Sequence, residues 1–167
     1  MKLNGSAWKF MQEDISTDLI RGKAWSHLPP QEQGAHCLEE VDATFAAQAQ
    51  PGDFIVAGKN FGCGSSTAAH VAVIGLGIGA VIAESLGKLF VTNAASAGLW
   101  AVSCPGIIAF TNAGDKLELD TASWQVRNLG TGRSIAAKPL PTFLCEMIEL
   151  GGEKNYLRAR LARESAG

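Results

Sequence analysis

The segment GKNFGCGSS, residues 58–66, decides how this sequence is interpreted. It follows the apolar, strand-like run FIVA at 54–57 and precedes a helix-compatible segment that starts near Thr67. Glycines and adjacent hydroxyls at a strand-to-helix turn let the backbone approach a ligand closely. Such a turn can also direct free N–H groups at an anion, with the positive end of the helix dipole behind them. The segment therefore predicts a site for a phosphate or a carboxylate, and a glycine-rich turn with a serine cap is the alternative interpretation.

The composition is typical of one compact, enzyme-like domain that spans residues 1–167. Hydrophobic residues make up 47% of the chain, enough for a core, and charged residues make up 18%, too few for a disordered chain. The formal net charge of -2 gives no basic footprint for nucleic acid. The N-terminal residues lack the apolar core of a signal peptide, and no apolar run approaches the roughly 20 residues of a membrane span. We expect a cytoplasmic protein that binds neither nucleic acid nor a membrane.

The cysteines argue against a metal site in this chain. Cys37, Cys63, Cys104 and Cys145 are far apart, and no Cys-x-x-Cys pair is present. This spacing suggests neither a zinc ribbon nor a self-contained iron–sulfur site, so we expect no metal or cofactor bound by this chain. Cys63 is a candidate nucleophile or redox thiol, because a helix N-terminus lowers a thiol pKa. No histidine stands at a recognisable catalytic spacing from it, so a loop-packing role is favoured.

Hydrophobic periodicity predicts an α/β chain. The run GLGIG at 75–79 ends a predicted helix instead of opening one, which argues against a dinucleotide site. An extended run is predicted after Trp8 and reaches Ile20, and a long loop follows over 21–33. Helices are predicted over 34–45, 68–76, 87–97 and 153–164, with a core-facing helical stripe over 140–148. Strands are predicted over 54–57, 80–84, 100–103 and 107–110, and a hairpin joins 116–120 with 124–129.

The motif and its surroundings resemble the small-subunit family of 3-isopropylmalate dehydratase, the swivel domain of the aconitase family. Residues 58–66 match that family's Gly-x-Asn-Phe-Gly-Cys-Gly-Ser-Ser signature, and DISTDLI at 14–20 is similar to its Asp-x-Ile-x-Thr-Asp-x-Ile segment. Several ordered motifs at family-like spacing are more specific than one glycine motif, and the resemblance implies a swivelling β/β/α fold. The similarity continues through HCLE at 36–39, where the family has its first helix, VIAES at 81–85, Phe90, Asn93, Ala94, Gly98, Leu99, Gly151, Gly152 and Tyr156.

The resemblance implies a hydro-lyase, which removes a proton next to a carboxylate and expels hydroxide. A Lewis-acid metal helps by coordinating the hydroxyl. In the family this metal is an open iron of a [4Fe-4S] cluster on the large subunit. We therefore expect a cluster-bearing large subunit as partner, in a heterodimer or heterotetramer. The expected substrate is a small hydroxy acid. Carried over by position, Ser65 is the base as an alkoxide, which N–H donors and positive charge must stabilise. Ser66 would donate a hydrogen bond, and Asp18 would orient groups near the site or merely cap a turn.

The substrate-binding residues carry the main departures from the family. After the serine pair the family usually has Arg-Glu-His, with the arginine clamping a substrate carboxylate, whereas this chain has Thr67 followed by two alanines and His70. Residues 24–27 read AWSH where relatives carry Tyr-Leu-Arg-Thr or an apolar variant. Ser26 does not suit a third carboxylate, and Trp25 suits an apolar or smaller substituent. The expected substrate contacts are Gly62, Cys63, Gly64, Thr67, Lys59, Trp25, Ser26 and His27, and the candidate replacement cations are Lys59, Lys23, His27 and His70.

Three functions therefore stay open. By resemblance, 3-isopropylmalate is the first candidate substrate. Loss of the arginine favours, as an alternative, a paralogous subunit for another branched hydroxy acid such as dimethylmalate. The third is a non-catalytic swivel-domain module that retains the fold for assembly or anion binding.

Overall fold

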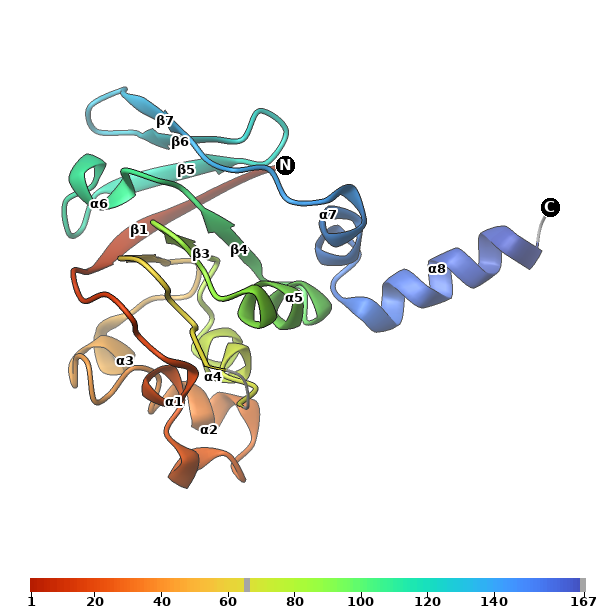
Figure 1. Ribbon diagram of the computed structural model, residues 1–167, viewed down its shortest axis with the longest axis horizontal. Coiled ribbons are helices and arrows are strands. Elements are labelled where there is room, and N and C mark those ends of the chain that lie inside the picture. The colour runs from red at the N-terminus through yellow and green to blue at the C-terminus, as the bar shows by residue number, and fades with distance from the viewer. Residues whose placement is uncertain (65–66, 166–167) are drawn as a thin grey trace.

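The computed structural model describes residues 1–64 and 67–165, and in these parts seven strands form one mixed sheet (Figure 1). The strand order is β4-β3-β2-β1-β5-β6-β7. Strands β1 to β4 are parallel to one another, while β5, β6 and β7 add to the β1 side as antiparallel neighbours. The strands are β1 (Lys2–Phe10), β2 (Phe54–Ala57), β3 (Ala80–Ala83), β4 (Trp100–Ser103), β5 (Lys116–Asp120), β6 (Gln125–Asn128) and β7 (Ser134–Ala136).

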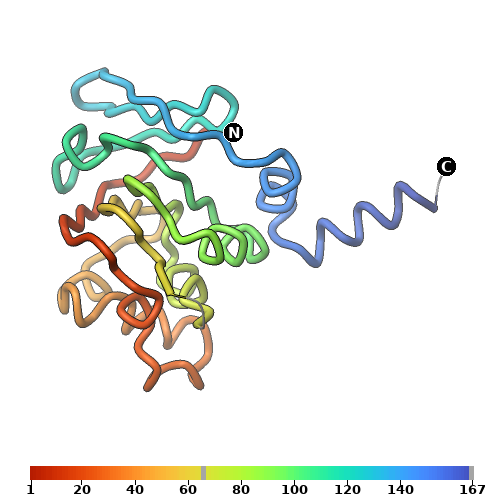
Figure 2. Tube along the Cα trace, viewed as in Figure 1, coloured from red at the N-terminus to blue at the C-terminus, as the bar shows by residue number. Residues whose placement is uncertain are grey.

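Helices cover the parallel half of this sheet. In the ribbon and tube views, α1 to α4 gather at one end of the molecule, and α8 projects away from the rest (Figure 2). No helix in the described parts is both long and apolar enough to cross a membrane. The helices are α1 (Thr17–Ile20), the 3-10 helix η1 (Lys23–Trp25), α2 (Pro30–Gly34), α3 (Phe45–Gln48), α4 (His70–Gly75), α5 (Lys88–Ser96), α6 (Ile107–Phe110), α7 (Thr142–Glu149) and α8 (Glu153–Ser165).

The parallel strands are buried on both faces. Successive residues of a strand point to opposite faces, so Ile55 and Ala57 join the core under α1, α4 and α5, while Phe54 and Val56 join the core formed with α6, α7 and the antiparallel strands. Every residue of β2 and β3 is buried. This double burial explains why the parallel strands read as continuous apolar runs, without the polar alternation of a half-exposed strand.

The three central parallel strands end at one edge of the sheet. Phe10 of β1 pairs in register with Ala57 of β2, and Ala57 pairs with Ala83 of β3. The segments that follow them, residues 11–18, 58–64 and 84–87, therefore leave the sheet side by side. In open α/β sheets, ligands bind at the carboxyl ends of the strands.

Several predicted elements are confirmed: strands 54–57, 80–84 and 100–103, the hairpin that becomes β5 and β6, helix 87–97 and the terminal helix. The run GLGIG follows the end of α4 and leads into β3, as expected. The predicted helix 34–45 is wrong, because α2 ends at Gly34 and turns follow. Leu38, in the middle of that segment, has φ +56° and donates its N–H to the carbonyl of Ile20 at 3.0 Å, so a tertiary hydrogen bond breaks the helix.

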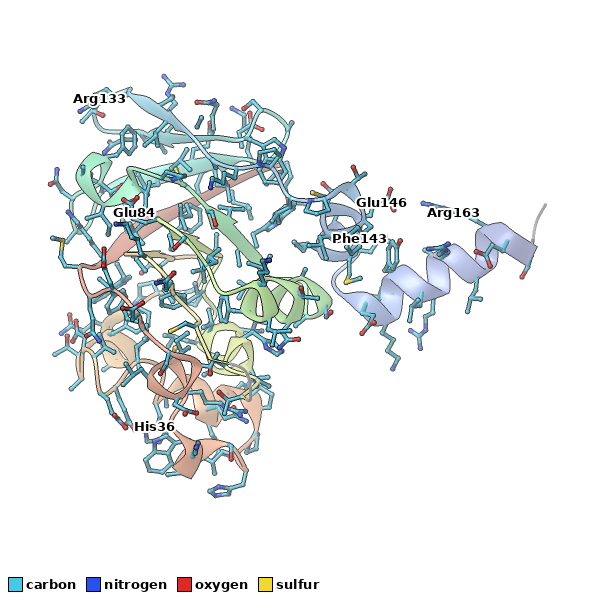
Figure 3. All side chains as sticks on the ribbon, viewed as in Figure 1. His36, Glu84, Arg133, Phe143, Glu146 and Arg163 are labelled. Carbon is cyan, nitrogen blue, oxygen red and sulfur yellow. The ribbon has the colours of Figure 1, made fainter. Side chains whose placement is uncertain are left out.

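Two other predictions fail for similar reasons. The extended run predicted after Trp8 is wrong, because the strand is β1, which spans Lys2–Phe10. Ser16 then caps the helical turn α1, and its hydroxyl accepts the N–H of Leu19 at 3.3 Å. The predicted strand 107–110 is the helix α6. The carboxylate of Glu84, labelled in Figure 3, accepts the N–H groups of Gly106 and Ile108 at 2.6 and 2.9 Å and so completes the start of this helix. Most of β1 and the short edge strand β7 were not predicted, and the predicted loop over 21–33 contains η1 and most of α2.

Candidate active site

The glycine motif pairs along one side with the segment after β1. A short parallel bridge joins Cys63 to Ser16. This pairing holds the start of α1 beside the motif. Three backbone hydrogen bonds connect the two segments: Asp14 N–H to Lys59 O at 2.9 Å, Gly62 N–H to Ile15 O at 2.8 Å, and Thr17 N–H to Cys63 O at 2.9 Å.

The other side of the motif pairs with the segment after β3. The N–H of Phe61 donates to the carbonyl of Ser85 at 3.1 Å, and the N–H of Gly87 donates to the carbonyl of Phe61 at 2.9 Å. Asn60 joins all three segments, since its N–H donates to Ser85 Oγ at 2.9 Å and its Nδ2 donates to Asp14 Oδ1 at 2.7 Å. The motif is therefore the middle member of three segments at the carboxyl edge of the sheet.

Position 62 requires glycine for two independent reasons. Gly62 has φ +76°, a conformation that costs other residues about 1 to 2 kcal/mol. A Cβ at this position would lie 2.4 Å from Cγ of Phe90, a contact too short for any real side chain. Phe90 is fixed in turn by an edge-to-face contact with Phe61, at 5.5 Å between ring centroids, and both rings are buried.

The motif does not present all of its N–H groups to a ligand. Those of Asn60, Phe61 and Gly62 are bound to neighbouring segments, and that of Cys63 donates to the carbonyl of Asn60 at 3.1 Å. The expectation that these N–H groups are free for an anion is therefore wrong. Helix α4 begins at His70, later than the predicted start near Thr67. Donors for an anion must come from side chains or from the backbone after Cys63.

The expected base Ser65 and its neighbour Ser66 lie outside the described residues. The residues that flank them are Gly64 and Thr67, both expected substrate contacts. A Cβ on Gly64 would lie 3.2 Å from Thr17 Oγ1, which places Gly64 against the first residue of α1. Thr67 is partly exposed, and its Oγ1 is buried without a hydrogen-bond partner.

Asp18 lies in the first turn of α1, next to Thr17. Its side chain is 50% exposed and lies 3.8 Å from Nζ of Lys23. Because Ser16 caps this turn, the alternative role of Asp18 as a cap is wrong. Asp18 and Lys23 line a surface hollow together with Ser16, Leu19, Gly22 and Glu40.

The loop that carries Trp25 is fastened to the turns after α2. The indole ring of Trp25 stacks on His36, with centroids 3.7 Å apart and planes 9° apart, and its Nε1 donates to Glu39. His36 Nδ1 lies 2.7 Å from the other oxygen of Glu39. Burial raises the pKa of Glu39, but the hydrogen bonds from His36 and Trp25 outweigh this effect and leave the pKa below its usual value. One face of Trp25 is thus already covered by His36, which is labelled in Figure 3.

Three of the candidate replacement cations, Lys59, Lys23 and His27, are exposed to solvent. Lys59 and Lys23 are exposed, and each lies 3.8 Å from a carboxylate, that of Glu13 and that of Asp18 respectively. His27 and Ser26 are also exposed, and Ser26 Oγ donates to the carbonyl of Lys23 at 2.9 Å.

Sequence reasoning missed the cation that is buried. Arg21 is only 8% exposed and contacts Gln33. The available signal was an arginine placed directly after the apolar pair Leu19 and Ile20, at the end of the family-like segment.

The described residues do not offer a metal or cluster site. They contain no group of three or more His, Cys, Asp or Glu side chains close enough to hold a metal ion. All four cysteines are free. Burial raises the pKa of the Cys37 thiol to about 12, and burial together with Glu84 raises that of Cys104 to about 12, so both stay protonated.

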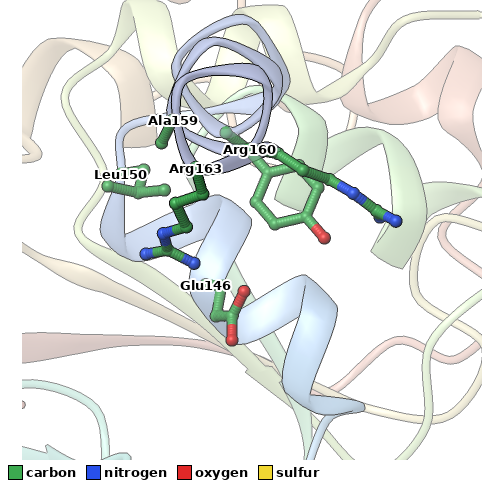
Figure 4. Close-up of a pocket in the computed structure, with 6 residues that line it drawn as sticks. Glu146, Leu150, Ala159, Arg160 and Arg163 are labelled. Atoms are coloured by element: carbon green, nitrogen blue, oxygen red, sulfur yellow. The ribbon is translucent and has the colours of Figure 1, made fainter. Parts of the chain in front are cut away.

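A hollow between α7 and α8 is a separate feature (Figure 4). None of its residues comes from the three segments at the carboxyl edge, so we do not assign it to the candidate site. It is lined by Glu146, Leu150, Tyr156, Ala159, Arg160 and Arg163.

Comparison with known proteins agrees with this geometry. Residues 3–106 match the family model of the aconitase C-terminal domain. The chain is 40% identical to the 3-isopropylmalate dehydratase small subunit of Thermodesulfovibrio yellowstonii over 98% of both chains. It is 36% identical to the 2,3-dimethylmalate dehydratase small subunit of Eubacterium barkeri, over 95% of this chain and 98% of that one. The crystal structure of 3-isopropylmalate dehydratase from Methanocaldococcus jannaschii superposes with a TM-score of 0.92 at 33% identity and covers 100% of both chains.

The tight fit at position 62 gives a first prediction. Gly62→Ala adds a Cβ against Phe90 at a left-handed backbone, and we expect it to lower the free energy of urea unfolding by at least about 3 kcal/mol. Gly114→Ala is the matched control, because Gly114 has φ +83° but no atom within 4 Å of the added Cβ. It should cost only about 1 to 2 kcal/mol. Equal losses for the two variants would show that the contact with Phe90 does not constrain the motif.

Proposed function

Because this chain belongs to the aconitase C-terminal domain family and is the small subunit of an aconitase-type hydro-lyase, we propose that it completes the active site of a dehydratase for a branched hydroxy diacid, with 3-isopropylmalate as the first candidate. The observation that carries this proposal is the position of the glycine motif. It lies at the carboxyl edge of the parallel strands, hydrogen-bonded between residues 14–17 and residues 85–87. This arrangement brings the motif next to Asp18, the other carboxyl-edge residue expected at the site.

The partner follows from the chemistry that this chain lacks. The relatives named above are themselves called small subunits. The described residues of this chain supply no set of cluster ligands. We therefore assign the [4Fe-4S] cluster and the activation of the leaving hydroxide to a large-subunit partner. The single-domain organisation of residues 1–167 and a cytoplasmic location stay predictions.

The contribution of this chain is to move a proton and hold the substrate. Ser65 Oγ would take the proton from the carbon next to a substrate carboxylate, and Ser66 would stabilise the resulting charge by donating a hydrogen bond. Asp18, exposed at the start of α1, would orient these groups. The remaining proposed contacts to substrate are those expected from the sequence: Gly62, Cys63, Gly64, Thr67, Lys59, Trp25, Ser26 and His27.

A second candidate substrate is 2,3-dimethylmalate. Two observations favour it: the full-length similarity to a 2,3-dimethylmalate dehydratase small subunit, and Thr67 at the place where the family usually has arginine. The non-catalytic alternative would retain the same fold and motif but would give no turnover with any large subunit.

Reconstitution tests this division of labour. The purified chain alone should bind no iron–sulfur cluster and show no dehydratase activity, because its described residues form no group of cluster ligands. Mixing it with the cluster-bearing large subunit from the same cell should produce turnover of 3-isopropylmalate or 2,3-dimethylmalate, measured as the absorbance of the unsaturated product. A coloured, iron-containing preparation of the isolated chain would contradict the assignment of the cluster to the partner. An assembled but inactive pair would favour the non-catalytic module.

The role of Ser65 can be tested in the same reconstituted pair. Ser65→Ala should lower kcat by at least about 100-fold, the lower end expected for a general base. Ser66→Ala is the adjacent control and should cost less, because it removes only a hydrogen-bond donor. Assembly, measured by size-exclusion chromatography, should be unchanged in both variants. Near-normal turnover by an intact complex carrying Ser65→Ala would eliminate the serine as the base.

A further inference from the structure

Arg21 is a buried charge with few partners. It follows α1 and is 8% exposed. Its Nη1 donates to Oε1 of Gln33 at 3.2 Å, while its Nε is buried and has no hydrogen-bond partner in the described part of the chain. Among the described residues, no carboxylate lies within 4.0 Å of the guanidinium. Arg21 is thus a buried positive charge that the described part of the protein does not neutralise.

Such an arrangement is costly to the folded state. A buried charge without a counter-ion destabilises a protein by several kcal/mol, and arginine cannot lose its proton to escape this cost. An amide such as that of Gln33 satisfies one N–H but supplies no negative charge. The cost is offset when an anion binds, and the planar guanidinium suits a carboxylate particularly well.

Two more unpartnered polar atoms lie in the segment that follows the serine pair. Thr67 Oγ1 and His70 Nδ1 are both buried without hydrogen-bond partners among residues 1–64 and 67–165. Burial lowers the pKa of His70, and the positive charge of Arg21 lowers it further, so the imidazole is neutral near pH 7. Arg21 donates its backbone N–H to the carbonyl of Thr17 at 3.0 Å, and Thr17 donates to the carbonyl of Cys63 at 2.9 Å, so the backbone of Arg21 lies one turn from the motif. Thr67 and His70 are each partly exposed, so solvent reaches part of both residues.

Helix α2, which carries Gln33, packs against the C-terminal end of α4. A Cβ on Gly75 of α4 would lie 1.8 Å from the carbonyl oxygen of Pro30 in α2, so the two helices are in backbone contact. Gln33 of α2 is buried, and its Nε2 donates to the carbonyl of Leu28 at 2.6 Å. With its amide group held in this way, Gln33 turns Oε1 toward Arg21 and fixes one edge of the guanidinium.

We propose that Arg21 is the substrate-carboxylate clamp of this subunit, replacing the arginine that relatives carry at the position of Thr67. This assignment rests on the proposed dehydratase function and deepens it, because it retains a two-carboxylate substrate despite the missing family arginine. The hydroxyl of Thr67 and the neutral ring of His70 add hydrogen bonds to the same carboxylate. Lys23 and Lys59 do not serve this role, since both are exposed and each already lies near a carboxylate.

The competing explanation is structural. Arg21 and Gln33 would then only anchor the loop that carries Trp25, and the interior would need both. The two explanations predict opposite effects on stability. An apolar residue in place of an unneutralised buried charge leaves stability unchanged or raises it, whereas the loss of an anchor lowers it.

The test compares Arg21→Met with Arg133→Met. Arg133 is the control because it is exposed, lies over the ring of Phe110 at 5.6 Å and directly precedes the antiparallel edge strand β7 (Figure 3). In the reconstituted pair, with 3-isopropylmalate and 2,3-dimethylmalate as probes, Arg21→Met should lower kcat/KM about 100-fold or more for the better substrate. Arg133→Met should leave it unchanged. In the isolated chain, the urea midpoint of Arg21→Met should equal or exceed that of wild type.

A rescue variant separates charge from packing. Arg21→Met combined with Thr67→Arg returns an arginine to the family position. The kcat/KM of this double variant should be at least about tenfold higher than that of Arg21→Met alone. Arg21→Lys should rescue only in part, because lysine cannot bind a carboxylate through two parallel N–H groups.

Either of two results would overturn the assignment: kcat/KM of Arg21→Met within about threefold of wild type, or a urea midpoint clearly below that of wild type. If the wild-type pair dehydrates neither diacid, the proposed function fails. The urea midpoints of the isolated chain then still decide whether Arg21 is an unneutralised charge.

Discussion

The site depends on the backbone pairing between the glycine motif and the segment after β1. Gly62 donates to the carbonyl of Ile15, and Thr17 donates to the carbonyl of Cys63, at 2.8 and 2.9 Å. These two hydrogen bonds hold α1 against the motif. They thereby set the positions of Asp18 at the start of that helix and of Arg21 at its end. Gly62 makes the pairing feasible, because any side chain there would collide with Phe90.

The same pairing explains why the motif is rich in glycine without being an open anion nest. Its N–H groups from Asn60 to Cys63 are used to join three segments, so the glycines serve close packing and backbone conformation. Recognition of a carboxylate then depends on side chains or on the backbone after Cys63. Exposed lysines beside carboxylates contribute little to binding, because water screens their charge. A guanidinium withdrawn from water, as in Arg21, interacts far more strongly with an incoming carboxylate.

The sequence predicted the parts of the fold that depend on local pattern. The buried parallel strands β2, β3 and β4, the hairpin and the helices α5 and α8 all follow from periodicity and turn residues. It could not predict elements set by distant contacts: Leu38 leaves the helical conformation because its N–H is bound to Ile20, and α6 forms where Glu84 accepts its first N–H groups. Burial of Arg21 was equally hidden, since it depends on the contact between α2 and α4 and on Gln33.

The most direct test of this account is amide hydrogen exchange in the isolated chain. If the pairing between the motif and residues 14–17 holds the site in place, the amides of Gly62 and Thr17 should exchange only through large-scale unfolding. Their opening free energies should then approach those of the buried amides in β2 and β3. Rapid exchange of Gly62 and Thr17 while β2 and β3 stay protected would contradict the account, because the motif would then be a mobile loop.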